Sequence, residues 1–421
     1  MDTECVELDS DAGADGGVTD PGIRKIAFFA HDSSLDRNDP QRITVLFFTH
    51  NSHEARFLKR LLSFRDLGFS VSWVGYDRGR GSPAVDNLLG QFPHTLLGRT
   101  FDEKYIQRAW ASFITLGRLV LKPGMLRAPD LLYCTNVENL AVVMLARWLR
   151  GLRGKVIYEV ADIQPAMVGS GAVGRLLRFV ERLCLRHIDL LVVTSPAYLD
   201  EFLTKRQLYD GPSFLLENKV YFGSETPQCK PLPDRIHEGP LTVGLFGNIK
   251  CERSLKFIEQ VARAARDEVS FTLRGYPTAD LKPALEQLVS DNPNIRFLGR
   301  YNSPDDLPEI YSEVDLCWGF DFRDAGGNSK WCLANRIYEA GLFGVPLLVE
   351  ADTMGGMYVE RLRSGWTFRE PLEETLLDFF RKVSPAEVRE RQKWIRGLPV
   401  MTFLHNQDLL RLKDILQNLS L

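Results

Sequence analysis

The chain has 421 residues, of which 44% are hydrophobic and 25% charged, and its formal net charge is -3. This length exceeds what a single hydrophobic core usually supports and favours two domains of similar size. The slightly acidic balance argues against nucleic acid as the main partner, and no apolar run reaches the roughly 18 residues that a membrane-spanning helix needs.

The first part of the chain predicts a tail followed by a doubly wound domain. Residues 1–40 are rich in Asp and Gly and poor in large apolar residues, so we expect a disordered acidic tail. A strand at 43–48, a loop, a helix ending at Gly68 and a strand at 71–74 follow. Such sheets bind ligands at the carboxyl ends of their strands, so the loop from His50 to Arg56 is a candidate site.

The later strands predict two Rossmann-like domains. Strand-like runs at 130–134, 155–160 and 190–195 alternate with helical periodicity, which completes an N-terminal domain over 41–222. Clustered Pro and Gly residues place a linker at 223–240. A second domain is expected over 241–385, with predicted strands at 241–246, 269–273, 295–298, 314–317 and 347–349. Residues 386–421 are expected to form helices that pack back across the domains.

The segment 335–349 forms one unit of helix, stop and strand. Gly344 can adopt the left-handed conformation that ends a helix, and Pro346 prevents the helix from continuing. The apolar residues 347–349 suit a strand that is covered on both faces. We expect this unit to lie at the ligand-binding end of the second sheet.

Glu339 lies on that helix, on the face opposite the one expected to pack against the sheet. Residues spaced roughly four apart share its face, namely Asn328, Trp331 and Asn335. Just upstream, residues 326–329 allow the backbone to turn with its amides pointing outward, which suits a phosphate group. A diphosphate at these amides and a sugar diol at Glu339 would together describe a nucleotide.

Five segments of this chain share their order and spacing with a known family. They are 53–56, 156–165, 189–195, 245–255 and 335–346. Through them the chain resembles family-4-like glycosyltransferases of the GT-B architecture, in particular bacterial exopolysaccharide sugar transferases of the succinoglycan type. The resemblance implies an α/β fold in which two doubly wound Rossmann-like domains face a central cleft.

The resemblance also implies donor-side roles. Glu339 would accept hydrogen bonds from the ribose, since a carboxylate offers two acceptor oxygens. The first glutamate of the family's E-x7-E motif is absent, and Trp331 stands eight positions before Glu339. Lys250, with Arg253 as a helper or as an ordinary exposed base, would neutralise the diphosphate. The remaining donor-side candidates are Gly247, Gly327, Asn328 and Asn335.

On the acceptor side, two carboxylates are candidates for polarising or deprotonating the attacking hydroxyl. Glu159 lies near the end of the strand at 155–160, and Asp162 follows that strand. Many family members carry a histidine at the position of Ala161, and its absence here favours Asp162 as the acidic group. A helix-capping role for Asp162 is the alternative. His53 and Arg56 belong to the acceptor-side loop. The spacing of His50 and His53 suits a metal, yet no third ligand follows at a recognisable distance.

No D-x-D sequence stands outside the tail, so we expect neither a metal nor another cofactor. The resemblance implies retention of the anomeric configuration, and inversion with Asp162 as general base stays open. Seven scattered cysteines without a C-x-x-C pair indicate a reducing compartment. We expect a cytoplasmic hexosyltransferase that uses a nucleotide-sugar donor, expected to be UDP-linked, and a glycan or polyprenyl-diphosphate-linked acceptor. The alternatives are a sugar-nucleotide epimerase of the same fold and a non-catalytic nucleotide-sugar-binding protein.

Two segments suggest contact with the inner face of a membrane. Residues 175–186 place arginines at helical spacing beside large apolar residues, and 110–125 combine apolar and basic residues. Such helices can rest on an anionic surface. The ordinary interpretation is an amphipathic helix whose apolar side faces the core. The arginines are Arg175, Arg178, Arg182 and Arg186.

Overall fold

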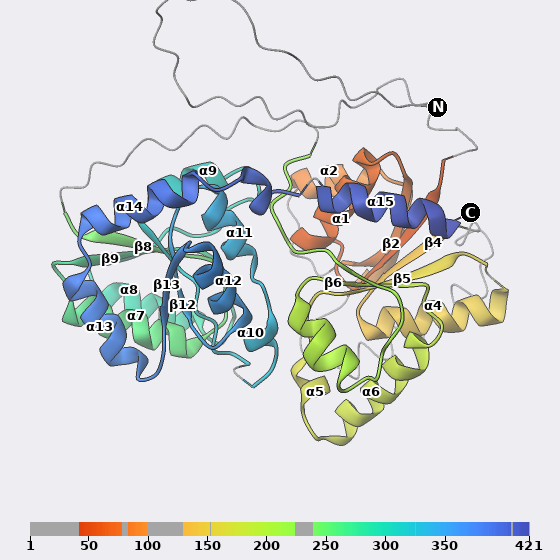
Figure 1. The fold of residues 1–421 in the computed structure, drawn as a ribbon, viewed down its shortest axis with the longest axis horizontal. Helices are drawn as coiled ribbons and strands as arrows, with labels where there is room; N and C mark the ends of the chain where they lie inside the picture. The colour runs from red at the N-terminus through yellow and green to blue at the C-terminus, as the bar shows by residue number, and fades with distance from the viewer. Residues whose placement is uncertain are drawn as a thin grey trace, which may run out of the picture.

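The computed structural model describes residues 42–77, 83–99, 129–151, 153–223, 239–324, 326–405 and 407–420. Two domains lie side by side, each built on a parallel sheet (Figure 1). The expected tail at 1–40, most of the expected linker and the basic stretch at 110–125 lie outside the described residues. Within the described part of the chain, no helix is long and apolar enough to cross a bilayer.

The N-terminal domain contains a seven-stranded sheet in the order β3-β2-β1-β4-β5-β6-β7. Every pairing between neighbouring strands is parallel. Its elements are β1 (Thr44–Thr49), α1 (Ala55–Asp66), β2 (Ser70–Asp77), α2 (Pro83–Gly90), β3 (His94–Arg99), β4 (Leu131–Thr135), α4 (Val137–Arg150), β5 (Lys155–Val160), α5 (Pro165–Val168), α6 (Ala172–Leu185), β6 (Leu190–Val193), the π-helix η2 (Tyr198–Thr204) and β7 (Ser213–Leu215).

The C-terminal domain contains a six-stranded parallel sheet in the order β10-β9-β8-β11-β12-β13. Its elements are β8 (Leu241–Ile249), α7 (Glu252–Ala264), β9 (Val269–Pro277), α8 (Lys282–Asp291), β10 (Ile295–Phe297), α9 (Leu307–Ser312), β11 (Leu316–Trp318), α10 (Asn328–Trp331), α11 (Asn335–Leu342), β12 (Leu347–Glu350), α12 (Met354–Leu362), β13 (Gly365–Phe368), α13 (Leu372–Lys382) and α14 (Pro385–Arg396). The 3-10 helix η3 (Val400–Thr402) and α15 (Gln407–Ser420) follow.

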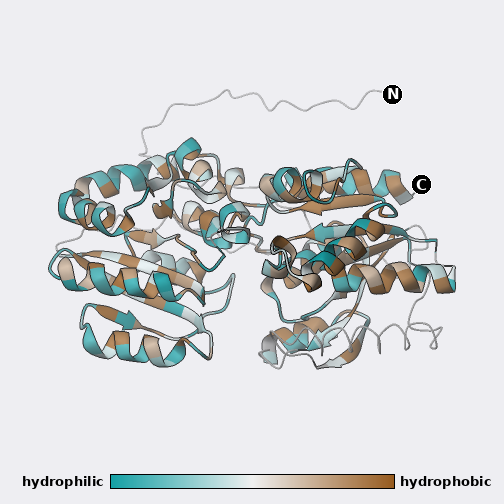
Figure 2. Cartoon of the chain, turned by 90° about the horizontal axis from the view of Figure 1, so that it is seen from below, coloured by the Kyte–Doolittle hydropathy of each residue, from teal (hydrophilic) through white to brown (hydrophobic). Residues whose placement is uncertain are grey.

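The predicted fold class is confirmed, because both sheets are doubly wound. In each, the strand order reverses beside the first strand, and apolar clusters fill both faces. The helices that cover the sheets carry both apolar and polar residues along their length (Figure 2). Three edge strands, β3, β7 and β13, were not predicted from the sequence.

The chain passes between the domains at two described places, and these two passages are bonded to each other. The backbone amide of Val220 donates to the Phe403 carbonyl at 2.9 Å, and the His405 amide donates to the Val220 carbonyl at 2.9 Å. After the second passage, α15 returns to the N-terminal domain (Figure 1). There Leu409, Leu412 and Leu416 join the apolar cluster on one face of the first sheet.

Candidate active site

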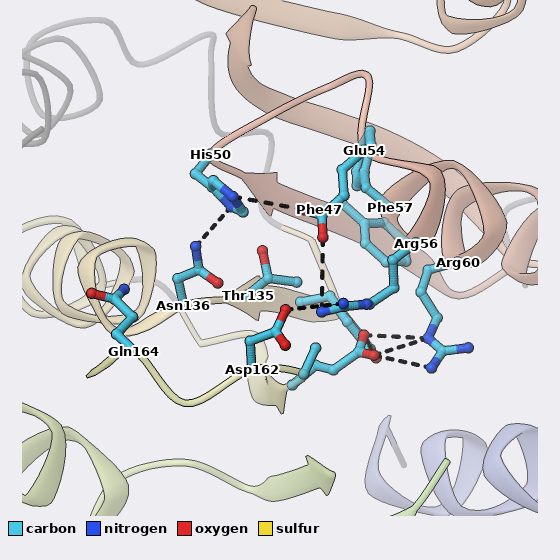
Figure 3. Close-up of a pocket in the computed structure, with 13 residues that line it drawn as sticks. Phe47, His50, Glu54, Arg56, Phe57, Arg60, Thr135, Asn136, Asp162 and Gln164 are labelled. Atoms are coloured by element: carbon cyan, nitrogen blue, oxygen red, sulfur yellow. Dashed lines mark hydrogen bonds and ion pairs between the residues drawn. The ribbon is translucent and has the colours of Figure 1, made fainter. Parts of the chain in front are cut away.

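A hollow of about 700 Å³, its open mouth included, lies at the carboxyl ends of β1, β4 and β5 (Figure 3). This is the edge where a doubly wound sheet binds its ligands. Phe47 and Tyr133 contribute aromatic surface, and polar side chains surround them. Those polar residues include His50, Glu54, Arg56, Asn136, Asp162 and Gln164.

Asp162 lies just after β5 and is held from two directions. Arg56 Nη2 donates to Asp162 Oδ2 at 3.0 Å, and Asn328 Nδ2 donates to Asp162 Oδ1 at 3.2 Å. Burial alone would lower the pKa of Arg56, but the neighbouring carboxylates, Asp162 first among them, raise it. The Asp162 side chain is still 56% exposed, so it is oriented but accessible to a ligand.

Glu159, three residues earlier, has a different environment. Arg60 donates to its Oε1 from Nε at 3.1 Å and from Nη2 at 3.0 Å, and the Tyr133 hydroxyl donates to Oε2 at 2.7 Å. Burial opposes ionisation of this carboxyl, but Arg60 and Tyr133 lower its pKa overall. Glu159 and Arg60 are both fully buried, so this pair forms the floor of the hollow.

The two histidines of the first loop point in different directions. His53 Nε2 lies 2.7 Å from Asp86 Oδ1 of α2, and its Nδ1 lies 3.3 Å from Asp77 Oδ1, so this ring faces the edge of the domain. His50 lines the hollow, where its Nδ1 lies 2.7 Å from Asn136 Nδ2 (Figure 3). The described residues contain no cluster of three or more His, Cys, Asp or Glu side chains placed to hold a metal.

A smaller hollow of about 260 Å³ lies at the carboxyl end of β8 in the other domain. Lys250 Nζ and Arg336 line it, and Lys250 Nζ lies 3.4 Å from Asp321 Oδ2. Burial alone would raise the pKa of Asp321, but Lys250 and other neighbours lower it. Arg253 is not among the lining residues, because its guanidinium bonds Glu370 at 2.5 Å and lies over the Phe322 ring.

Two glycines allow close strand approach beside this hollow. Gly247, at the end of β8, has φ +103°, and Gly275 of the neighbouring β9 has φ +141°. A Cβ at Gly275 would lie 1.8 Å from the Gly247 carbonyl oxygen, so no side chain fits there.

Glu339 lies at the domain boundary and is only 8% exposed. The Tyr311 hydroxyl donates to its Oε2 at 3.1 Å, and burial raises the pKa of Glu339 against the opposing charge of Lys59 from the N-terminal domain. Lys59 Nζ itself donates to Asn218 Oδ1 at 2.7 Å, and Asn218 in turn bonds Asn335. Glu339 and Asn335 therefore face the other domain.

The predicted helical face from residue 328 to 339 is wrong, because the helix is interrupted. Residues 332–334 separate α10 from α11, and α11 is buried on nearly all sides, the Glu339 side included. The expected stop is confirmed, since Gly344 adopts φ +72°. Trp331, the last residue of α10, packs its ring against Phe202 of the N-terminal domain.

The amides of residues 327–329 do not point outward as expected. The Asn328 amide donates to Asp324 Oδ2 at 3.0 Å, and the amides of Gly327 and Ser329 donate to the Asp324 carbonyl. The Asn328 side chain crosses to the other domain, where its Oδ1 accepts from the Ile163 amide at 2.9 Å. This loop therefore joins the domains next to Asp162.

The two hollows are joined across the domain boundary by Asn328. Its Nδ2 donates to Asp162 of the first hollow at 3.2 Å, and its amide donates to Asp324, which stands three residues after Asp321 of the second hollow. Several further residues of this region were not predicted from the sequence, because their partners are distant in the chain. They are Lys59, Arg60, Asn136, Gln164, Tyr311 and Arg336.

Known proteins share this organisation. Residues 46–210 match the family described as "Glycosyl transferase 4-like domain". The succinoglycan biosynthesis protein ExoL of Rhizobium meliloti (strain 1021) is 30% identical over 313 residues, which are 73% of this chain and 77% of ExoL. The structure of Anabaena HepE, solved with UDP and glucose, aligns with a TM-score of 0.65 at 14% identity. The alignment covers 90% of this chain and 100% of the HepE chain.

Sucrose-phosphate synthase from Thermosynechococcus elongatus has a TM-score of 0.64 at 14% identity over 90% of this chain and 99% of its own. At such identities these structures establish the fold, whereas the similarity to ExoL extends over most of both sequences. The chain belongs to the glycosyl transferase 4-like family and is a GT-B glycosyltransferase related to ExoL.

Proposed function

We propose that this protein transfers a hexosyl residue from a UDP-sugar to a hydroxyl of a glycan or polyprenyl-diphosphate-linked acceptor, with retention of configuration. The observation that carries the proposal is the pairing of two unlike hollows across the domain boundary. One holds an oriented, accessible carboxylate, Asp162, and the other holds two cations, Lys250 and Arg336. ExoL is named for succinoglycan biosynthesis, and HepE was solved with UDP, which supports the substrate class.

The donor side has the charge that a departing nucleotide diphosphate requires. Lys250 and Arg336 converge on the hollow at the end of β8, with Asp321 balancing part of their charge. Cations placed where negative charge develops stabilise the transition state. We assign this task to Lys250 and Arg336, with Gly247 and Gly275 letting the backbone approach, and give Arg253 a supporting role near Glu370.

Glu339 is the proposed ribose ligand. Its carboxylate is at the domain boundary, keeps contact with solvent, and already accepts one hydroxyl hydrogen bond, from Tyr311. A ribose diol offers two further hydroxyl donors of the same kind. Asn335 and the loop that contains Gly327 and Asn328 lie on the acceptor-facing side of this region, and we propose that they shape the space around the donor sugar.

The acceptor side can bind a neutral sugar. Phe47, Phe57 and Tyr133 supply apolar surface to the hollow, and His50 and Asn136 supply hydrogen-bonding groups. Asp162 is proposed to orient or polarise the attacking hydroxyl. Glu159 is proposed to stabilise the floor of the hollow and not to contact the substrate, since Arg60 and Tyr133 already bond its oxygens. His53 is proposed to position the loop that carries Arg56.

The test uses labelled nucleotide sugars, with and without membrane extract, and measures product formation, free nucleotide and nucleotide affinity. Asp162→Asn should abolish transfer and keep UDP affinity, with exposed Asp200→Asn as control. Glu339→Gln and Lys250→Met should weaken UDP affinity at least tenfold, with exposed Glu374→Gln and Lys256→Met as controls.

Each alternative function has its own outcome in this test. Conversion of the sugar nucleotide without an acceptor would indicate an epimerase, and binding without turnover would indicate a non-catalytic protein. Inverted product stereochemistry, measured by NMR, would overturn retention. We further propose that transfer needs no metal, so activity should persist in excess EDTA. Intact turnover in both Asp162→Asn and Glu339→Gln would overturn the site.

A further inference from the structure

Helices α4 and α6, which pack against each other, both expose large apolar side chains. Trp148 is 76% exposed, Phe179 64% and Leu176 62%, which is unusual for residues of this size. We name this surface the apolar face. It consists of Leu145, Trp148 and Leu149 of α4 and Val173, Leu176, Phe179 and Leu183 of α6.

The apolar face is distinct from the side of α6 that packs in the domain. Cys184 and Leu185 are buried in the core, and Leu177 and Val180 pack against that core. The expectation that the apolar side of this helix faces the interior therefore holds for one of its two apolar stripes. The second stripe points outward, and Figure 2 views the molecule from the side on which α5 and α6 lie in Figure 1.

The two helices present the apolar face as one surface. Arg147 of α4 donates from Nη1 to the carbonyl of His187, the residue just beyond the end of α6, at 3.4 Å. The C-terminal ends of the helices are therefore neighbours, and both helices pack on the same core cluster. Trp148 and Leu149 consequently lie beside the end of α6 that carries Leu183.

Arginines predominate among the exposed charged residues around the apolar face, and Asp189, just beyond the end of α6, is paired with Arg147 and Lys155. Arg153, Arg175 and Arg186 are exposed, and Arg182 borders the same edge of α6. The acidic residue of α6, Glu181, is 1% exposed, and α4 carries no acidic residue after Glu138 in its first turn. The surface thus combines apolar side chains with an arginine border.

A loop beside α6 exposes one further apolar residue. Arg182 Nη2 donates to the Arg206 carbonyl at 2.7 Å, which holds the loop against the arginine edge of the helix. In that loop Leu208 adopts φ +58° and projects into solvent. A bulky side chain in the left-handed region is uncommon, and the surrounding structure must compensate its cost.

We propose that the apolar face docks on an anionic lipid bilayer. Apolar side chains on the outer face of a helix enter the boundary between headgroups and acyl chains, and tryptophan favours that boundary. Arginines at the edge pair with lipid phosphates, which selects an anionic surface over a neutral one. This charge complementarity favours lipid over a second copy of the chain, because two copies would bring like charges together.

Docking in this orientation also bears on the acceptor. Arg178 Nη1 donates to the carbonyls of Met167 at 2.6 Å and Gly169 at 2.8 Å, which ties α6 to α5. Helix α5 begins right after Gln164, a lining residue of the Asp162 hollow. A bilayer at α6 would thus lie on the side of the domain that leads to the acceptor hollow. Vesicle binding itself needs no nucleotide, so it does not depend on the proposed reaction.

The experiment is sedimentation of the full chain with phosphatidylcholine vesicles that contain or lack phosphatidylglycerol. The wild type should sediment with the anionic vesicles. The L176S/F179S variant should lose at least tenfold in partitioning, and R175S/R186S should lose most of the preference for anionic vesicles. M357S is the matched control, since Met357 is 60% exposed on α12 of the other domain and should behave as wild type.

UDP affinity and the circular dichroism spectrum, both expected to be unchanged, report that the variants are folded. Wild-type protein that stays in solution with anionic vesicles, or L176S/F179S that sediments as wild type does, would overturn the proposal. A dimer detected by light scattering that L176S/F179S dissociates would assign the apolar face to a second copy instead. Normal vesicle binding without UDP affinity would overturn the proposed function and leave this inference intact.

Discussion

Glu159 and Asp162 are three residues apart, and the structure predicts opposite consequences when each loses its charge. Glu159→Gln leaves the Arg60 guanidinium buried without an anion. Two Arg60 contacts, at 3.1 and 3.0 Å, and the Tyr133 contact at 2.7 Å all end on the Glu159 carboxylate. Breaking a buried ion pair of this kind costs about 3–5 kcal/mol of the free energy of unfolding.

Asp162→Asn has a much smaller effect on folding. Its partner Arg56 lies 3.0 Å away, but the Asp162 side chain is largely exposed, and exposed pairs are worth about 0.2–1 kcal/mol. We expect Asp162→Asn to unfold almost as wild type does and to lose transfer. Glu159→Gln should unfold roughly 6 °C or more below wild type, and its activity should fall in proportion to the folded fraction.

The assay is thermal unfolding followed by circular dichroism, with transfer measured on the same samples at a temperature where both variants are folded. Because Arg60 and Tyr133 lower the pKa of Glu159, its stabilising effect is present at neutral pH and is lost as the pH falls through that pKa. The difference in unfolding midpoint between Glu159→Gln and wild type should therefore become smaller in acid. Equal midpoints for Glu159→Gln and wild type at pH 7 would contradict the assignment of Glu159 to the scaffold.

Three further predictions concern other parts of the molecule. Burial raises the pKa of Glu181 to about 7, so the free energy of unfolding of the wild type should fall as the pH rises from about 5 to 7, by up to about 3 kcal/mol. Glu181→Gln should flatten this profile in urea unfolding, because the new amide does not titrate, and Gln207 can turn its amide to offer an oxygen that lacks a partner among the described residues. An unchanged slope would contradict this assignment. Gly275→Ala should lower the unfolding midpoint far more than Gly299→Ala, which has open space at φ +78° and should cost about 1–2 kcal/mol; equal shifts would rule out the close strand contact. Trp331→Ala should loosen the domain contact and increase the radius of gyration in small-angle scattering, whereas an identical scattering profile would show that α10 does not hold the domains together.

The fold could be predicted because its signals are local. Short continuous apolar runs marked the central strands, and the Gly344 stop identified α11 and β12. The helix break at 332–334 could not be predicted, because the helical periodicity of the sequence continues through it. Beside the break, Trp331 packs against Phe202, a residue more than 100 positions away in sequence.

The candidate site shows the same limit. Glu159 and Asp162 are both acidic residues at the end of one strand, and what separates them is Arg60, which lies 99 positions away on α1. His50 and His53 are likewise alike in sequence, but α2 supplies Asp86 to one of them alone. The spacing on α6 revealed an apolar stripe, but the position of α4 decides which stripe is covered.

The return of α15 to the first domain affects the order in which the protein can be completed. Leu409, Leu412 and Leu416 fill a gap over β1 and α1, more than 300 positions earlier in the chain. Domains usually fold one after another as the ribosome releases them. Here the core of the N-terminal domain stays incomplete until the segment 407–420 has been synthesised, so the C-terminal domain is the first that can fold completely.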